Sequence, residues 1–499
     1  MAFLRAKGDS GMKLTEEQRM VVSAVRSGES VKIAAFAGTG KTTTLRAVAY
    51  LALQGKRVLY LAFNRSTAEE ARGKFTDNVE VRTAHSLAFR AVGRAYQGRI
   101  ARSLLACRRD ASSLCQKELS DVCQVGGRSS WQAHAAVSQT LQGWLQSDDT
   151  AVGPQHVPAV VAEACTRLGW REALADAARA YWRQMEGPRG RLPVTHDVYL
   201  KAWRLSQPVL PYDVILWDEV QDANPVMLGL VRGQEAQQVL VGDTHQQLYA
   251  FRGAVDAMRQ VRLRELPLTQ SWRFGPQIAA AANRVLDLIG EGRRLTGMAA
   301  PGQVLQGAQQ ADVRAVLGRT NGGLVAEALA LLDHQRTIAV VGGVEEMVRL
   351  LLALHELRTT GSSSHAELAV FANWAELEEV AQTPIGAAFR PLVDLVKKHK
   401  GEIPKMAERL RREAKPDEAD AEVVLSTVHK AKGREWPSVR LLDDFPAPLR
   451  GDPEHLEWDE DELNVQYVAQ TRAQQLLHLS GNGQVLRDAA AIMGASRAG

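Results

Sequence analysis

The chain has 499 residues, of which 45% are hydrophobic and 24% are charged, as in an ordinary globular protein. This length exceeds what one hydrophobic core can serve, so we expect several domains. No apolar run approaches the ~20 residues that cross a bilayer, and the N-terminus lacks the apolar stretch of a secretory signal, so the sequence predicts a cytoplasmic protein without membrane contact. The formal net charge of +4, from 61 basic and 57 acidic residues, is too small to indicate nucleic acid by itself.

The cysteines and one acidic stretch are interpreted as structural. The eight-residue spacing of Cys107, Cys115 and Cys123 places them on one face of a helical region, as expected for buried residues. An iron–sulfur cluster is the alternative, but these three and Cys165 form no C-x2-C pair. We therefore expect reduced core thiols, and we interpret the acidic residues in 452–462 as a solvated surface.

The first part of the chain alternates between β-runs and helical segments. A β-run at 31–36 leads through a glycine-rich turn into a helix that starts at Lys41, and further β-runs follow at 57–63, 212–217 and 238–243. Strands that alternate with helices indicate a parallel sheet covered on both faces.

The second part repeats this alternation. Its β-runs lie at 314–319, 337–342, 422–427, 439–442 and 476–480. Two other segments have helical periodicity and few β-runs, namely 88–205, with 16 basic and 10 acidic residues, and 345–418. We expect an α/β fold with two cores, the first formed by 1–87 and 206–270 with the insert 88–205, and the second formed by 271–344 and 419–499 with the short insert 345–418.

A phosphate-binding loop follows the first β-run. The string Ala35-Phe-Ala-Gly-Thr-Gly-Lys-Thr matches the Walker A pattern, with alanine in place of the first glycine, and stands in the required strand–loop–helix context. Gly38 and Gly40 allow backbone N–H groups to point at phosphates, at the positive end of a helix. Lys41 is expected to contact the β- and γ-phosphates of ATP, and Thr42 to bind Mg²⁺.

Two carboxylates complete the predicted hydrolytic site. Asp218 and Glu219 directly follow the β-run 212–217, and a carboxylate at the end of such a strand can hold Mg²⁺ opposite the phosphate loop. We assign Asp218 to the metal and Glu219 to the general base that activates water.

These motifs, in this order, resemble the UvrD-like branch of the superfamily 1 helicases over most of both cores. The further matching segments are 14–18, 62–71, 83–87, 241–254, 271–273, 427–436 and 466–473. The strings AFAGTGKTTTL, FNRSTAEEA and ELNVQYVAQTRA resemble the F-box DNA helicase group in particular, although we expect no F-box here, because the first motif begins at residue 14. The resemblance implies that both cores are RecA-like.

The resemblance implies roles around the nucleotide. Gln18 would read the adenine edge, Trp272 would stack on adenine in place of the usual tyrosine, and Glu435 would hold the ribose. Gln246 would sense the γ-phosphate, and Arg273 and Arg472 would neutralise it from the second core. Thr39, Thr43 and Gly433 complete the expected nucleotide-binding set.

The resemblance also implies a single-stranded DNA path. Its aromatic platforms would be Phe63, Tyr249 and Phe251, the last in place of the usual tryptophan, and its backbone or base contacts would come from His85, Arg252 and His429.

We therefore expect an ATP-dependent 3′→5′ translocase and helicase that acts on single-stranded DNA and single/double-strand junctions. A DNA-stimulated ATPase that remodels protein–DNA complexes in repair or defence, with a protein partner and little unwinding, is the alternative. A nucleotide-gated binding module is a third hypothesis, which Glu219, Arg273 and Arg472 argue against. A 5′→3′ enzyme is disfavoured by Lys432, and a fused nuclease by the 27 residues that follow Arg472.

Overall fold

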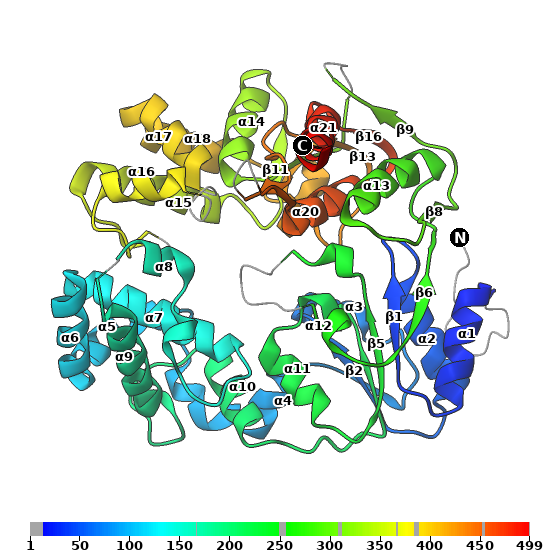
Figure 1. The fold of residues 1–499 in the computed structure, drawn as a ribbon, viewed down its shortest axis with the longest axis horizontal. Helices are drawn as coiled ribbons and strands as arrows, with labels where there is room; N and C mark the ends of the chain where they lie inside the picture. Colours follow the sequence, from blue (N-terminus) through cyan, green and yellow to red (C-terminus); the bar gives the residue numbers. More distant parts are fainter. Residues whose placement is uncertain are drawn as a thin grey trace. The chain divides into compact units, whose positions relative to one another are not determined.

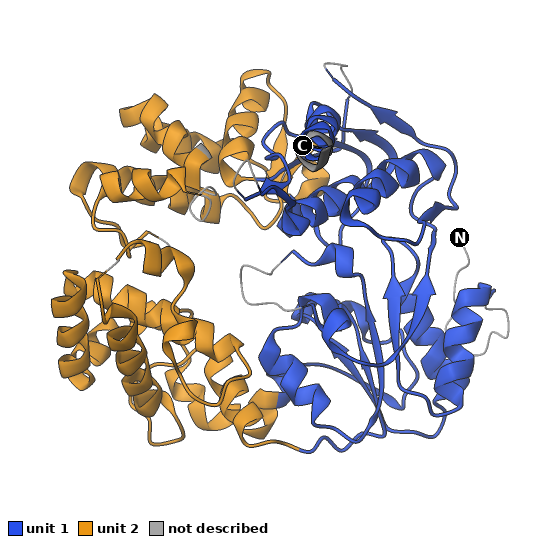
Figure 2. Cartoon of the chain, in the orientation of Figure 1, with its two compact units in different colours: residues 1–87, 209–319, 428–499 blue, residues 88–208, 320–427 orange. Residues whose placement is uncertain are grey.

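The computed structural model describes residues 13–165, 167–248, 256–307, 312–365, 368–383, 389–451 and 455–498. These residues form two compact units. Unit 1 comprises 1–87, 209–319 and 428–499, and unit 2 comprises 88–208 and 320–427 (Figure 2). The predicted division into two cores and two inserts remains a prediction.

A six-stranded parallel sheet forms the first half of unit 1. Its strands are β1 (Val31–Ala35), β2 (Val58–Ala62), β3 (Val79–Thr83), β4 (Val214–Trp217), β5 (Gln237–Gly242) and β6 (Arg264–Leu268). They lie in the order β3-β2-β4-β5-β1-β6. The central strands are almost wholly apolar, as expected for a parallel sheet that is buried on both faces.

Helices cover both faces of this sheet (Figure 1). The helices α1 (Glu16–Arg26), α2 (Lys41–Ala52) and α3 (Arg65–Ala71) bury their apolar residues in one hydrophobic cluster with β1, β2, β4 and β5. The helix α11 (Pro225–Arg232) lies on the other side of the sheet in Figure 1. A capping box at Thr15 and Gln18 sets the start of α1.

A second parallel sheet occupies the other half of unit 1. Its strands β10 (Ala315–Gly318), β13 (Trp436–Leu441), β16 (Ala473–His478) and β9 (Gln303–Leu305) are neighbours in that order. The helices of this half are α13 (Pro276–Ile289), α19 (Val428–Ala431), α20 (Glu460–Gln470) and α21 (Asn482–Ala498). Two parallel sheets with helices confirm the predicted α/β fold class.

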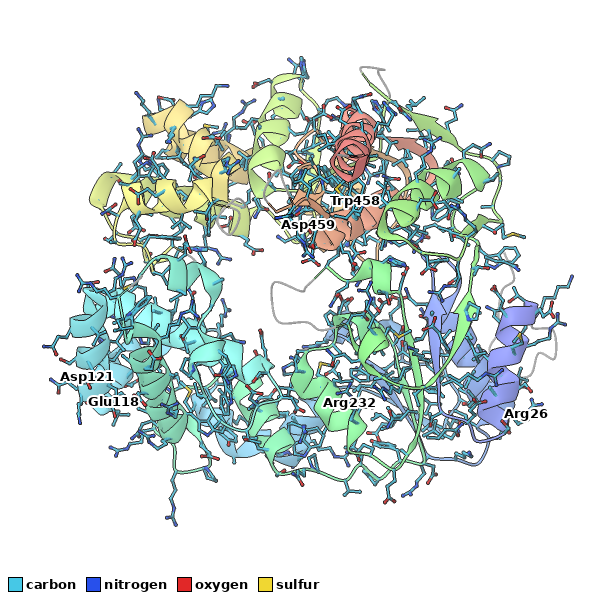
Figure 3. The ribbon with its side chains drawn as sticks, in the orientation of Figure 1. Arg26, Glu118, Asp121, Arg232, Trp458 and Asp459 are labelled. Carbon is cyan, nitrogen blue, oxygen red and sulfur yellow. The ribbon has the colours of Figure 1, made fainter. Side chains whose placement is uncertain are left out.

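Part of the acidic stretch has a local structural role. The Asp459 side chain caps the N-terminus of α20 by accepting hydrogen bonds from the N–H groups of Asp461 and Glu462. Figure 3 labels Asp459 beside Trp458 at the start of this helix. A cap with acidic residues in the first helical turn is stabilised by the helix dipole.

Unit 2 is mainly helical. Its first segment holds α5 (Arg108–Leu114), α6 (Gln116–Gly126), α7 (Ser130–Gln146), α8 (Ala159–Glu163), α9 (Trp170–Met185) and α10 (His196–Leu205). Its second segment holds α14 (Asn321–Asp333), α15 (Glu345–Thr360), α16 (Trp374–Gln382), α17 (Arg390–His399), α18 (Ile403–Glu413) and the parallel strands β11 (Ile338–Val340) and β12 (Val423–Thr427). The two segments meet at Arg128, whose guanidinium binds both carboxylate oxygens of Glu376 at 2.9 and 2.5 Å.

The cysteines are free thiols. Cys107 and Cys115 are buried, and burial raises the pKa of Cys107 to about 12 and that of Cys115 to about 11. Among the described residues, no group of His, Cys, Asp and Glu side chains could hold a metal ion, and no helix has the length and apolar character that spanning a membrane requires. By their burial, Cys107 and Cys115 are packing residues of unit 2.

We predict that Leu45→Ala destabilises unit 1 by about 2–5 kcal/mol, because Leu45 is fully buried between α2 and the first sheet. Leu51→Ala on the same helix, where the side chain is 36% exposed, should change stability by no more than about 0.5 kcal/mol. Denaturant unfolding followed by circular dichroism measures both. Equal losses for the two variants would contradict this account of the core.

Candidate nucleotide-hydrolysis site

The phosphate loop joins β1 to α2. Gly38 has φ +75° and Gly40 has φ +82°, a left-handed conformation that strongly favours glycine. No side chain caps the N-terminus of α2, which begins at Lys41, so its first N–H groups remain available to a ligand. The Thr39 hydroxyl donates a hydrogen bond to the Phe36 carbonyl at 2.8 Å and fixes the loop from within. The loop therefore has the form of an anion-binding cradle.

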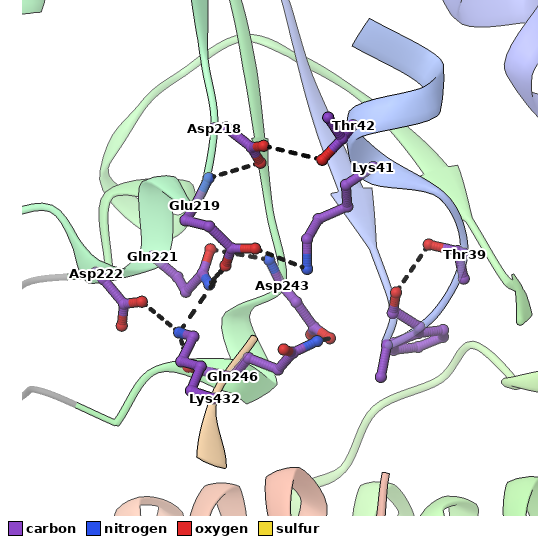
Figure 4. Close-up of polar contacts among 12 residues, drawn as sticks. Thr39, Lys41, Thr42, Asp218, Glu219, Gln221, Asp222, Asp243, Gln246 and Lys432 are labelled. Atoms are coloured by element: carbon purple, nitrogen blue, oxygen red, sulfur yellow. Dashed lines mark hydrogen bonds and ion pairs between the residues drawn. The ribbon is translucent and has the colours of Figure 1, made fainter. Parts of the chain in front are cut away.

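Thr42 and Asp218 offer two oxygens side by side. The Thr42 hydroxyl donates to Asp218 Oδ2 at 3.3 Å (Figure 4). The Tyr60 hydroxyl donates to the same oxygen at 2.6 Å. Asp218 is 2% exposed, and burial together with the adjacent Glu219 raises the pKa of its carboxyl group. A hydroxyl and a carboxylate are the oxygen ligands that Mg²⁺ prefers, so the donor set fits this ion.

Glu219 follows the end of β4, and its side chain faces Lys41 at the start of α2. It has φ +56°, a strained conformation for a residue other than glycine. Its carboxylate lies 3.4 Å from Lys41 Nζ and 3.9 Å from Lys432 Nζ, and it accepts a hydrogen bond from Gln221 Nε2 at 2.5 Å. Burial alone would raise the pKa of Glu219, but the two lysines outweigh burial and lower it, so the carboxylate is ionised at neutral pH.

Lys432 directly follows the short helix α19, in the second half of unit 1. Its ammonium group forms an ion pair with Asp222 and donates to the Gln246 carbonyl at 2.5 Å (Figure 4). Asp222 has its side chain fully buried, and burial raises the pKa of this carboxyl to about 6 although Lys432 opposes the change. The ion pair between Asp222 and Lys432 therefore connects the segment after β4 to the second half of unit 1.

Gln246 and Arg472 meet in the interior. Gln246 Nε2 donates to Asp243 Oδ2 at 2.6 Å, and Arg472 Nη2 lies 3.5 Å from Gln246 Oε1. Arg472 is 1% exposed and also donates to the carbonyls of Val468 and Arg434, at 3.0 and 3.3 Å. Burial, with Arg273 nearby, lowers the pKa of Arg472 to about 9, so the group remains a cation at neutral pH.

Arg273 and Glu435 form a second pair beside the loop. Arg273 Nε lies 2.5 Å from Glu435 Oε2, and Arg273 Nη1 donates to the Thr471 carbonyl at 3.0 Å. Glu435 also accepts from Gln474 Nε2 at 2.9 Å. Both arginines that the family resemblance assigns to the γ-phosphate therefore lie in unit 1 with the loop.

The predicted adenine-binding residues also lie at the loop. Gln18 Nε2 donates to the Thr44 hydroxyl at 3.1 Å on the first turn of α2, where Thr43 is its neighbour in sequence. The backbone N–H of Trp272 donates to the Gly38 carbonyl at 2.9 Å, and the residue is 56% exposed, so its ring is accessible for stacking on a base. Gly433 has φ +80°, the left-handed conformation again.

Three predicted DNA-contact residues can be placed. Phe63 directly follows β2, and His85 lies on α4 (Ala84–Ala91), directly after β3. Because β2 and β3 are parallel neighbours, these two residues emerge at the same edge of the sheet. His429 lies on α19. The predicted contacts Tyr249, Phe251 and Arg252 lie outside the described residues.

Sequence reasoning missed two tyrosines at this site. Tyr60 binds Asp218, as described above. The Tyr467 hydroxyl accepts a hydrogen bond from the Ala37 N–H of the loop at 3.0 Å and donates to Asp243 Oδ2 at 3.2 Å. Tyr467 lies within the matched segment 466–473, and this position was the only signal that could have found it.

Comparison with known families gives two matches. Residues 18–252 match the model of an AAA domain, and residues 389–484 match the model of the UvrD-like helicase C-terminal domain.

Curated relatives cover nearly the whole chain. F-box DNA helicase 1 of Gallus gallus is 32% identical over 522 residues, which span 94% of this chain and 49% of that protein. F-box DNA helicase protein 1 of Schizosaccharomyces pombe is 30% identical over 94% of this chain and 57% of its own length. ATP-dependent DNA helicase UvrD2 of Mycobacterium tuberculosis is 26% identical over 94% of this chain and 78% of its own length. The chain thus spans about half the length of the two F-box relatives.

We predict that Gly38→Ala weakens ATP binding by at least about tenfold, or about 1.4 kcal/mol. An added Cβ would lie 2.7 Å from the Cβ of Arg273, so the loop or the arginine must move. Gly55→Ala is the control, because Gly55 has φ +77° but nothing within 4 Å of an added Cβ. Titration with a fluorescent ATP analogue tests both variants, and unchanged affinity in Gly38→Ala would refute the packing described here.

Proposed function

This chain belongs to the UvrD-like helicases of superfamily 1, and we propose that it is an ATP-dependent translocase and helicase that moves 3′→5′ along single-stranded DNA. The observation that supports a motor most directly is the meeting of Arg472 with Gln246 beside the phosphate loop. Arg472 follows α20 in the second half of unit 1, whereas Gln246 follows β5 of the first sheet. Residues that follow elements of different halves of unit 1 therefore lie in contact, which supports a hydrolytic site shared by the two sheets.

Hydrolysis requires a base for the attacking water. The ionised Glu219 carboxylate accepts the proton of the water as its oxygen attacks the γ-phosphorus. The proton thus moves to Glu219, and the bond between the γ-phosphorus and the leaving ADP oxygen breaks. Lys41, which contacts Glu219 in this structure, binds the β- and γ-phosphates when ATP is present.

Positive charge stabilises the phosphoryl group during transfer. Thr42 and Asp218 would hold Mg²⁺, which neutralises charge on the phosphate oxygens. Arg273 and Arg472 supply the remaining cationic groups, and an arginine in this role contributes roughly 10³–10⁵ in rate in related P-loop enzymes. Both arginines belong to the second half of unit 1, so hydrolysis depends on the approach of the two sheets. Each catalytic cycle therefore changes the spacing between DNA contacts on one sheet and those on the other.

The proposed DNA substrate and the proposed 3′→5′ direction of movement are inferred from the resemblance to this family. The names of the relatives specify DNA helicases, and Phe63, His85 and His429 would contact the strand together with Tyr249, Phe251 and Arg252. Base stacking on an aromatic platform contributes ~1–3 kcal/mol per base. We further propose that the protein acts in the cytoplasm at single/double-strand junctions, in repair or defence.

We predict that single-stranded DNA strongly stimulates ATP hydrolysis, and that Glu219→Gln reduces the stimulated rate by about 10²–10⁴ while ATP binding persists. The control Glu29→Gln changes an acid that only pairs with Arg264 on the surface, at 3.0 Å, and should leave the rate unchanged. A coupled phosphate-release assay gives the rates. Hydrolysis that ignores DNA, or that survives in Glu219→Gln, would refute the proposal.

A further inference from the structure

The Tyr467 hydroxyl has contacts that the hydrolytic steps described above do not use. Tyr467 lies on α20, in the second half of unit 1, and its side chain is fully buried. Its hydroxyl lies between two groups of the first half, the Ala37 N–H of the phosphate loop and the Asp243 carboxylate after β5. Ala37 and Asp243 are buried as well. One hydroxyl thus joins the second half to two buried polar groups of the first.

The direction of these two hydrogen bonds is fixed by chemistry. A tyrosine hydroxyl has one proton, and a carboxylate can only accept. The Tyr467 hydroxyl therefore donates to Asp243 Oδ2 at 3.2 Å and accepts from the Ala37 N–H at 3.0 Å. Burial and the neighbouring Asp243 raise the pKa of Tyr467 well above its ordinary value, so the hydroxyl keeps its proton. The ring packs edge-on against His245, with centroids 5.9 Å apart, which limits its movement.

Asp243 connects this hydroxyl to two residues that the proposed mechanism places near the γ-phosphate. Its Oδ2 also accepts a hydrogen bond from Gln246 Nε2 at 2.6 Å. Its backbone N–H donates to Gln221 Oε1 at 3.1 Å, and Gln221 Nε2 donates to Glu219 at 2.5 Å (Figure 4). A chain of residues joined by hydrogen bonds therefore runs from the phosphate loop through Tyr467 to Gln246 and Glu219.

Burial makes this network sensitive to the loss of a single member. A buried polar group that loses its partner keeps the full cost of having left water, so such a network is stable only when its members are satisfied together. Removal of the Tyr467 hydroxyl takes this partner from the Ala37 N–H and a donor from Asp243. The link that fixes the phosphate loop relative to Gln246 is then lost. Phosphoryl transfer depends chiefly on such positioning.

We propose that Tyr467 is a positioning residue for ATP hydrolysis, whose hydroxyl sets the phosphate loop against the Asp243–Gln246 pair. This role rests on the proposed function, because it assumes that ATP is hydrolysed at this loop. Tyr467 comes from the second half of unit 1 and both hydroxyl partners come from the first, so these two bonds form only when the halves are together. Tyr467 thereby makes the geometry of the loop depend on the approach of the two sheets.

The test compares Tyr467→Phe with the wild type in steady-state ATP hydrolysis by the full chain, with and without single-stranded DNA. The ring remains and only the hydroxyl is lost, so we expect kcat to fall about 10–100-fold while KM for ATP changes less than about threefold. Tyr181→Phe is the matched control, because Tyr181 is a fully buried tyrosine of unit 2 whose hydroxyl lies 2.8 Å from His134 Nδ1. It loses the same atom and should leave both constants unchanged.

A second measurement separates positioning from packing. If Tyr467 acts through Asp243 and Gln246, Gln246→Ala already removes the group that Tyr467 positions. The double variant Tyr467→Phe/Gln246→Ala should then be no more than about threefold slower than Gln246→Ala alone, since residues that act as one unit are not additive. Losses that multiply would show that the two residues act independently and would overturn the inference.

Two further results would overturn it, namely a wild-type kcat in Tyr467→Phe and an equal fall of kcat in Tyr181→Phe. Thermal unfolding checks that each variant is folded. Should Tyr467→Phe lack a cooperative transition, Asp243→Asn removes an acceptor oxygen from the same network, and an unchanged kcat in that variant would contradict the proposed role.

The same assays distinguish failure of this inference from failure of the proposed function. A wild type whose hydrolysis ignores DNA would refute the motor, whereas a loss of that hydrolysis in Tyr467→Phe alone would still support the positioning role. A DNA-stimulated wild type with an equally active Tyr467→Phe variant would leave the motor in place and refute the role of Tyr467. A wild type that does not hydrolyse ATP would refute both.

Discussion

Arg472 carries its charge where water does not reach, with only 1% of its surface exposed. A buried cation is tolerated only when its N–H groups find acceptors, and here these are the carbonyls of Val468 and Arg434, the Thr471 hydroxyl and the Gln246 amide oxygen. Gln246 is itself fixed by Asp243. Three of these acceptors belong to the second half of unit 1 and the fourth, Gln246, belongs to the first half, so this buried charge joins the two halves of unit 1.

The same constraint explains the pairing of charges around the loop. Lys41 contacts Glu219, and Lys432 contacts Asp222, so each of these two lysines has a carboxylate within reach. Incoming phosphates would compete with these carboxylates for the lysines. The two lysines lower the pKa of Glu219 and keep its carboxylate ionised, and the hydrogen bond from Gln221 orients it.

The sequence predicted those parts of the fold whose signal is local. The predicted β-runs 57–63 and 212–217, which contain the strands Val58–Ala62 and Val214–Trp217, were identified because buried parallel strands are almost wholly apolar. Strands β3 and β6 were missed because they lie at the two edges of the sheet and carry charged residues, and β6 contains Pro267, which only an edge strand accommodates. Helical periodicity correctly indicated that 88–205 and 345–418 are mainly helical.

At the candidate site, too, the sequence predicted the residues that belong to contiguous motifs and missed those whose partners are distant along the chain. The phosphate loop and Asp218–Glu219 are contiguous motifs whose chemistry follows from residue type and spacing. Tyr60 and Tyr467 could not be assigned, because their hydroxyl partners lie 158 and 224 residues away along the chain. Nothing in a single sequence states which tyrosine reaches which carboxylate. The roles given to individual residues at this site remain predictions.

The central claim, that hydrolysis shared between two sheets drives movement along DNA, is tested most directly by stopped-flow translocation on single strands of increasing length, labelled at one end. The account predicts that the signal from a 5′-end label is delayed in proportion to strand length and requires ATP, while a 3′-end label shows no such delay. A delay that is independent of length at both ends, despite DNA-stimulated hydrolysis, would contradict a motor.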